Sequence, residues 1–195
     1  MTSIKPIPVL LALLLVAPVF AQTVATPELR DVKQQQRIEN GLQSGQITTR
    51  EAAKLERKEA RVNKIEANAL KDGTVNDAEK TRIRAMQDKT SRDIYSEKHD
   101  AQTGNPNSVS SKRMQSDVQR NIHQEQRIAN GIKDGSLTNH ERAKLERGQA
   151  KIERKEYRDG RNGHIGAHEQ RNIQRAENHQ SRRIRRQRHD GQHAG

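Results

Sequence analysis

Apolar side chains recur at spacings of three, four and seven positions over most of the chain, which is the pattern of one face of an α-helix. Leu55, Val62, Ile65 and Ala69 follow this spacing in one segment, and Lys, Arg, Glu and Gln fill most of the positions around them. These polar residues are good helix formers. The pattern predicts an all-α protein with helices over residues 28–43, 49–70, 76–98, 118–133, 139–158 and 167–188.

Four short turns in the chain share one pattern: a glycine, any residue, an aliphatic residue, a small residue that is usually polar, and a glutamate three positions later. They begin at Gly45, Gly73, Gly135 and Gly163. The glycine favours the left-handed conformation that ends a helix, and the small polar residue with its glutamate forms a capping box that starts the next one. Gly166 takes the cap position of the fourth turn, so we expect a weaker helix start there.

The chain is internally repeated. Residues 36–100 align without a gap with residues 126–190, and 23 of the 65 aligned positions are identical. The segment 101–117 between them is rich in Ser, Asn, Gln and Gly, which predicts a flexible linker. We therefore divide the chain into a first copy (28–100), this linker and a second copy (118–190), preceded by a short segment (22–27) and followed by a tail (191–195).

Each copy is expected to form a small three-helix unit of the helix–glycine turn–helix type, because short turns place consecutive helices side by side and antiparallel. Only 30% of the residues are hydrophobic and 32% are charged, so the core should be marginal. The alternative is an extended chain of helices with little tertiary packing.

The first 21 residues have the features of a secretory signal peptide. Lys5 supplies a positive charge, Val9 to Val16 form an apolar run, and Val19-Phe20-Ala21 resembles a cleavage site. The alternative, a membrane anchor, needs about 20 apolar residues and is disfavoured by the short run. We expect export to the periplasm or the medium, with the mature chain starting at Gln22.

Catalysis is not expected from this composition. The chain has no cysteine, no catalytic-serine turn and no strand pattern that would carry a phosphate loop. We expect most carboxylates to lie on exposed helical faces beside Lys or Arg, where nothing desolvates them. The sequence therefore predicts a non-enzymatic protein without catalytic residues or a cofactor.

Positive charge is concentrated near the end of the chain. The formal net charge is +12, and residues 171–188 contain seven arginines and one glutamate. Such a helix attracts polyanions, and the candidate residues are Arg182, Arg183, Arg185, Arg186 and Arg188. An anionic envelope polymer or lipid headgroups are the expected partners, because export and the scarcity of aromatic residues disfavour nucleic acid. A simply solvated basic surface is the alternative.

Metal binding is the second functional hypothesis. The turns resemble degenerate EF-hand loops, with the glycine, the aliphatic residue and the final glutamate in place, but the first and third ligand positions lack carboxylates. Histidines at a spacing of four form two further candidate pairs, which are His164 with His168 and His189 with His193. Helix capping explains the turns without a metal.

Overall fold

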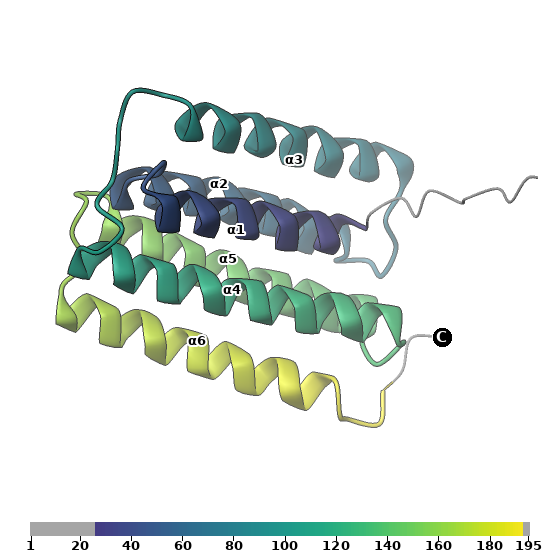
Figure 1. Ribbon diagram of the computed structural model, residues 1–195. Helices are drawn as coiled ribbons and strands as arrows, with labels where there is room; N and C mark the ends of the chain where they lie inside the picture. The colour runs from purple at the N-terminus through teal and green to yellow at the C-terminus, as the bar shows by residue number, and fades with distance from the viewer. Residues whose placement is uncertain (1–25, 193–195) are drawn as a thin grey trace, which may run out of the picture.

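The computed structural model describes residues 26–192, so the expected signal peptide and His193 lie outside the described residues. This part of the chain contains six α-helices and no strand, as Figure 1 shows. The helices are α1 (Pro27–Ser44), α2 (Thr49–Ala69), α3 (Asp77–Lys98), α4 (Val109–Lys133), α5 (Asn139–Gly160) and α6 (Ala167–Gln187). The prediction of an all-α fold is confirmed.

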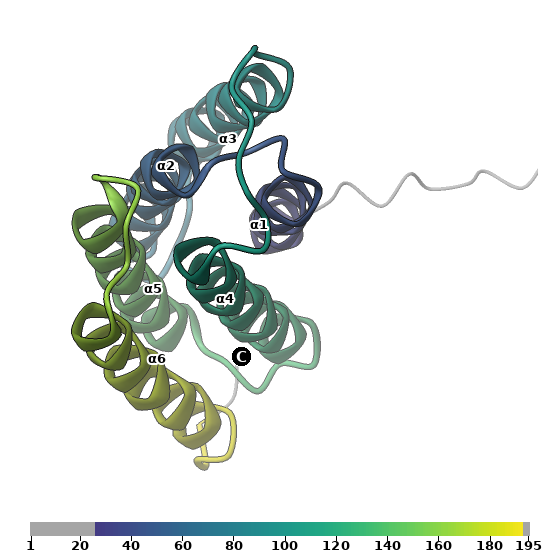
Figure 2. The same ribbon diagram turned by 60° about the vertical axis from the view of Figure 1, so that its left-hand side comes forward.

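The helices form two layers (Figure 2). Helices α3, α2, α5 and α6 follow one another in a curved outer layer, and α1 and α4 lie on its concave side. The four helices α1, α2, α4 and α5 form the centre of the molecule, and α3 and α6 flank it. Helices α2 and α5 run antiparallel, since the guanidinium of Arg57 near the start of α2 donates to the hydroxyl of Tyr157 near the end of α5 (3.1 Å).

The two halves of the chain share one core instead of packing as separate three-helix units. The most extensive helix contacts join α2 to α5 and α1 to α4, across the copies. The larger apolar cluster likewise combines side chains of both halves, including Leu55, Val118 and Ile173. The apolar stripe of one copy is too thin to bury itself, so each half completes the other.

The expected linker is shorter than 101–117, because α4 already begins at Val109. Ser108 caps this helix by accepting a hydrogen bond from the backbone N–H of Ser111 (3.1 Å). The backbone N–H of Gly104 donates to the carbonyl of Gly45 (2.8 Å), which fixes the connection against the first turn. The small polar residues of this segment therefore cap α4 and hold the connection against the first turn, in addition to linking the two halves.

The four glycine turns end and start helices as predicted. All four turn glycines have a positive φ, between 73° and 89°. Thr48, Asn76 and Thr138 cap α2, α3 and α5, each in a reciprocal capping box with the glutamate three residues later. Gly166 has no side chain to offer, and only Glu169 contributes there, by accepting from the Gly166 backbone N–H (2.6 Å).

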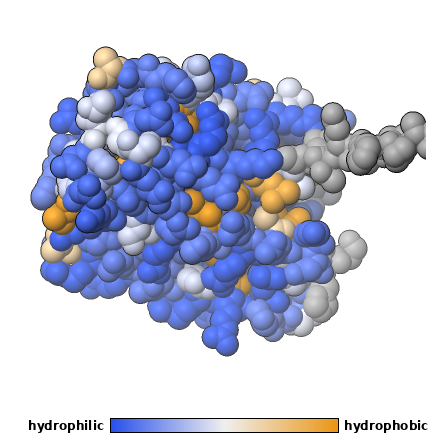
Figure 3. Space-filling view, viewed as in Figure 1, coloured by the Kyte–Doolittle hydropathy of each residue, from blue (hydrophilic) through white to orange (hydrophobic). Residues whose placement is uncertain are grey.

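Several contacts recur in the two halves at the offset of 90 residues. The guanidinium of Arg37 donates to the carbonyl of Ser91 (3.1 Å), and that of Arg127 to the carbonyl of Ser181 (3.0 Å). Most of the surface is hydrophilic in the view of Figure 3. None of the described helices combines the length and the apolar character needed to cross a membrane.

Candidate functional site

A line of acidic and amide side chains runs through the centre of the molecule. On α2 these residues follow a three-four-three spacing, and α5 repeats the spacing at the aligned positions. This is the spacing of the inward positions of paired helices. All eight are at most 1% exposed: Glu56, Glu59, Asn63, Glu66, Glu146, Gln149, Glu153 and Glu156.

Neighbouring helices add further buried carboxylates to this line. They are Glu28 and Asp31 of α1, Asp117 and Glu125 of α4, and Glu177 of α6. The expectation that most carboxylates lie on exposed faces is therefore wrong for the central helices. Each of α2 and α5 is covered on several sides by other helices, so both its apolar stripe and its acidic stripe are buried.

Basic side chains do not match these acids in the interior. Among the described residues no Lys, Arg or His is fully buried. Two arginines reach the line from its edge: Arg142 forms an ion pair with Glu28, and Arg120 forms one with Glu177 (Nε to Oε2, 3.0 Å). The molecule thus places its cationic side chains outside and many of its carboxyl groups inside.

Amides supply most of the interior hydrogen bonds to the carboxylates. Asn63 donates to Glu153 (2.8 Å), at two aligned positions of the repeat, so α2 meets α5 about an approximate two-fold axis. Gln35 donates to Glu56 (3.0 Å) and Asn121 donates to Glu156 (2.9 Å). Other oxygens have no hydrogen-bond partner, including both of Glu59 and both of Glu146.

Burial makes these acids weak. Desolvation raises the pKa of Asp31, Glu56 and Asp117 to about 7, although amide hydrogen bonds oppose the rise. It raises the pKa of Glu146 to about 8. It also raises the pKa well above the ordinary range for Glu59, Glu66, Glu125, Glu153 and Glu156, where neighbouring carboxylates add to the effect.

The interior cannot hold all of this charge uncompensated. Burying one unpaired carboxylate costs several kcal/mol. A protein of this kind has a net stability of only about 5–15 kcal/mol, so a few bare carboxylates would consume it. The interior acids must therefore be neutralised by protons or by bound cations.

Two groups of acidic residues within the described chain bring three ligand oxygens within 4.8 Å of one another. The first consists of the buried Glu28, Glu66 and Glu146. The second, Glu51 with Glu97 and Asp100, lies near the start of α2 and is partly exposed. Glu51 is also the capping-box residue of α2, since its Oε2 accepts from the backbone N–H of Thr48 (2.9 Å).

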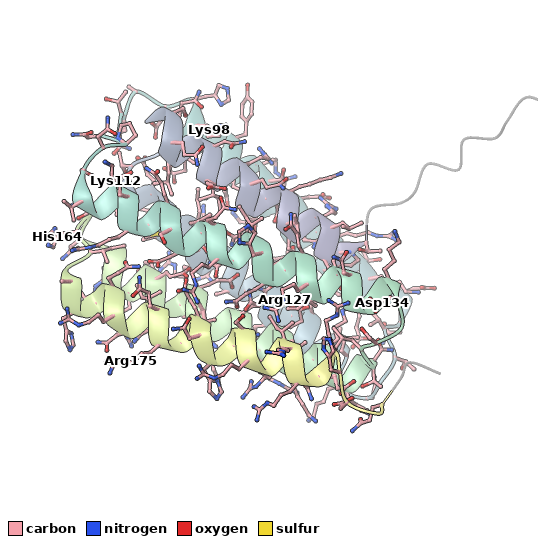
Figure 4. The ribbon with its side chains drawn as sticks, turned by 60° about the horizontal axis from the view of Figure 1, so that its bottom comes forward. Lys98, Lys112, Arg127, Asp134, His164 and Arg175 are labelled. Atoms are coloured by element: carbon pink, nitrogen blue, oxygen red, sulfur yellow. The ribbon has the colours of Figure 1, made fainter. Side chains whose placement is uncertain are left out.

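The histidine candidates lie at the surface and join neither group. His164, in the turn before α6, has its Nδ1 3.1 Å from the hydroxyl of Ser110, and Figure 4 shows its place at one end of the molecule. His168 has its Nδ1 near the side-chain amide of Asn172 (3.2 Å). His189 is exposed after the end of α6.

The EF-hand-like turns use their final glutamate for capping. Glu79, Glu141 and Glu169 each accept a hydrogen bond from the backbone N–H of the residue three positions earlier, as Glu51 does. Because one carboxylate oxygen is engaged in this way, the local geometry is that of a helix start. The buried carboxylates are a separate and richer set of oxygen donors.

The predicted polyanion residues form one wall of a shallow groove between α5 and α6. Arg182, Arg183, Arg185 and Arg186 line it from α6, opposite Lys144, Arg147 and Lys151 of α5. Arg188 instead turns toward α4, where it pairs with Asp134 (2.6 Å), a residue that Figure 4 labels at the end of that helix. The structure thus adds three cations from α5 to the predicted arginines.

The spacing on α2 and α5 carried a signal for the buried carboxylates. Acids and amides recur there in the three-four-three pattern, in the same register in both copies. A solvent-exposed helix face does not require the same spacing of acids and amides in both halves of the chain.

Comparison with protein families, curated proteins and solved structures finds no match to this chain.

Proposed function

We propose that this protein is an exported, non-enzymatic cation-binding protein, and that its ligands are the carboxylates of the bundle interior. The observation that carries the proposal is the number of buried carboxylate oxygens without a hydrogen-bond partner. Bound cations would neutralise them without the cost of isolated buried charges. Full burial also keeps these groups away from any substrate, which favours binding over catalysis.

The donor set favours a hard cation. Every candidate ligand in the line is a carboxylate or an amide, and the whole chain contains no cysteine. All seven histidines of the described chain are exposed. Oxygen-only ligands suit Ca²⁺, Mg²⁺ and Mn²⁺, whereas imidazole and thiolate suit Zn²⁺ and Cu²⁺. This proposal keeps metal binding as a function but places it away from the loops and histidines.

The test is a thermal melt of the mature chain, first treated with a chelator and then titrated with Ca²⁺, Mg²⁺, Mn²⁺ or Zn²⁺. A cation that binds the folded state raises Tm with its concentration, and the chelator reverses the rise. We expect this for at least one hard cation, with heat of binding in calorimetry. If no hard cation binds, or if only Zn²⁺ acts and His164→Ala abolishes its effect, the proposal is wrong.

Binding of an anionic partner is a second candidate, favoured by the groove between α5 and α6. Seven basic side chains from the two helices converge on it. Such a concentration of positive charge attracts a polymer of phosphate or carboxylate groups by releasing its counterions. An anionic polymer of the cell envelope or lipid headgroups would fit an exported protein.

A binding assay with heparin at increasing salt tests the groove. Wild-type protein should bind at low salt and be released at high salt. Arg182→Glu with Arg183→Glu should weaken binding much more than the matched change of Arg82→Glu with Arg84→Glu on exposed positions of α3. Equal losses of heparin binding in the two double variants would indicate a response to net charge alone and would show that the groove is not the binding site.

The two halves are best explained as copies of one three-helix unit that pack against each other. Support comes from the sequence repeat and from hydrogen bonds that recur at the same offset. Gln34 donates to the carbonyl of Gln87 (2.7 Å), and Gln124 donates to that of Glu177 (3.2 Å). Such an arrangement brings the acidic stripes of both copies into one interior.

A further inference from the structure

We propose that one hard divalent cation binds among Glu28, Asp31, Glu66 and Glu146, at the end of the interior line formed by α1, α2 and α5. This inference rests on the proposed cation-binding function and assigns it to one place. The four residues are called the α1–α2–α5 cluster below. All four are at most 2% exposed.

Oxygen atoms converge in the α1–α2–α5 cluster. Oxygens of Glu28, Glu66 and Glu146 lie within 4.8 Å of one another. The side-chain nitrogen of Gln87 is close to three oxygens at once: Asp31 Oδ1 (2.8 Å), the Pro27 carbonyl (2.9 Å) and Glu66 Oε1 (3.2 Å). An amide nitrogen has two hydrogens and cannot satisfy three acceptors fully. The cluster therefore has more acceptors than its donors can serve.

Unpartnered oxygens provide the second observation. Both oxygens of Glu146, Oε2 of Glu66 and Oδ2 of Asp31 are buried without a hydrogen-bond partner. Arg142 is the cation that contacts the cluster, through its ion pair with Glu28. One guanidinium against four carboxylates leaves three negative charges when all are ionised. A divalent cation would remove most of that remainder.

The aligned cluster in the other half is a built-in comparison. Glu56 and Glu156 align with Glu146 and Glu66, but Asn121 replaces Asp31 and Val118 replaces Glu28. The Asn121 amide donates to Glu156 (2.9 Å) and to Glu56 (3.4 Å), so it links the two carboxylates where an acid would repel them. Gln35 donates to Glu56 and Gln170 donates to Asp117. Three amides thus reach this half, and both oxygens of Glu156 accept from Asn121, while Oε1 of Glu56 and Oδ2 of Asp117 have no partner.

The contrast predicts that the α1–α2–α5 cluster, and not its aligned counterpart, holds the cation. Four carboxylates and the Pro27 carbonyl can supply the six or more oxygens that Ca²⁺ takes, because a carboxylate binds through one or both oxygens. Mn²⁺ accepts the same donors in a six-coordinate shell. The site has no nitrogen or sulfur ligand among its four side chains to favour a softer ion.

Glu66→Gln and its aligned control Glu156→Gln test the assignment in the full mature chain. Both changes are isosteric and remove one buried carboxyl charge. We would measure Ca²⁺ and Mn²⁺ binding by calorimetry and by native mass spectrometry, with circular dichroism to confirm that each variant is folded. We expect one ion per wild-type chain, a loss of affinity of at least about tenfold in Glu66→Gln, and a loss below about threefold in Glu156→Gln.

Asp31→Asn provides an independent variant, because asparagine already occupies the aligned position 121. It should also abolish tight binding while leaving the helix content unchanged. Binding that survives Glu66→Gln and Asp31→Asn, or that is lost equally in Glu156→Gln, overturns the assignment but leaves a cation-binding interior. The absence of any hard-cation binding by the wild-type chain overturns the proposed function itself.

Discussion

Single buried carboxylates give the sharpest prediction at the residue scale. Glu59 is 1% exposed and neither of its oxygens has a hydrogen-bond partner, while its aligned position carries Gln149. Glu59→Gln should therefore stabilise the chelated protein at pH 8 by about 1–3 kcal/mol, because an amide of the same shape has no charge to desolvate. Urea unfolding measures this.

The surface substitution Asp77→Asn is the control for that change. Asp77 lies in the first turn of α3 and pairs with Lys80, so its loss should cost only a few tenths of a kcal/mol. Equal destabilisation of both variants would mean that Glu59 has a compensating partner. The buried acid would then be a structural group that needs no proton or cation.

Residues near helix ends could be predicted from the local sequence, whereas the burial of the interior acids depends on how distant helices pack. A cap depends on two residues three positions apart, such as Thr48 and Glu51, so the local sequence determines it. Burial of Glu56 depends on which other helices cover α2, and those lie far away in the chain. The low average hydrophobicity of the chain is a poor guide to the burial of such residues, because it leads one to expect every glutamate at the surface.

At the scale of the helices, the N-terminal caps give two predictions of opposite sign for the free energy of unfolding. Thr48→Ala should cost on the order of 1 kcal/mol, because the side-chain oxygen that accepts from the backbone N–H of Glu51 (3.2 Å) is lost. Gly166→Ser should stabilise by a few tenths of a kcal/mol, since Gly166 already has an extended backbone suited to a capping serine. Chemical denaturation of both variants in chelator checks the two signs.

Metal should not change these two effects. If Ca²⁺ stabilised the wild type but not Thr48→Ala, the turn itself would participate in metal binding and the EF-hand-like interpretation would gain support. Equal cation responses in wild type and variant agree with a purely capping role. The cap and the interior line can be separated in this way because Thr48 and Glu51 precede Glu56, the first acid of the line on α2.

The elements themselves followed from local pattern, but their partners did not. The predicted helices 49–70 and 76–98 agree closely with α2 and α3, because apolar spacing and caps act within one segment. The first turns of α4, from Val109, contain serines, and the local composition there is that of a linker. The pairing of α2 with α5 could not be predicted in this way. It arises because the apolar stripe of one half is too thin to be buried within that half, and the sequence of a single segment does not show this.

Shared packing gives a prediction for the whole molecule. A fragment of residues 26–103 contains α1, α2 and α3 but lacks the faces of α4 and α5 on which α1 and α2 pack. We expect it to be poorly folded as a monomer, and any helix it forms should increase with protein concentration as two copies pair. Circular dichroism with analytical ultracentrifugation tests this. A concentration-independent, cooperative melt of the monomer would show that one copy suffices.

The charged interior also predicts an unusual response to pH. Folding raises the pKa of Asp31, Glu56 and Asp117 to about 7, and that of Glu146 and Glu177 to about 8, mainly because burial penalises the ionised form. Arg142 and Arg120 oppose the rise at Glu146 and Glu177. Between the unfolded pKa near 4 and these values, the folded state holds more protons than the unfolded state.

The contribution of these acids to the stability of the chelated protein should therefore be greatest below about pH 4 and fall as the pH rises from there through 7 to 8. Each acid that ionises only in the unfolded state contributes a slope of about −1.4 kcal/mol per pH unit. Because several acids act together, even a fraction of their summed effect should lower Tm measurably between pH 5 and pH 8. An ordinary protein with exposed or paired carboxylates shows the opposite trend over the acidic part of this range.

A saturating hard cation should restore Tm at pH 8 much more than at pH 5, since protons and cations compete for the same oxygens. Thermal melts at both pH values, with chelator and with Ca²⁺ or Mn²⁺, measure this difference directly. A Tm that is flat or rises with pH in chelator would mean that the interior acids are already paired, and the need for a bound cation would disappear.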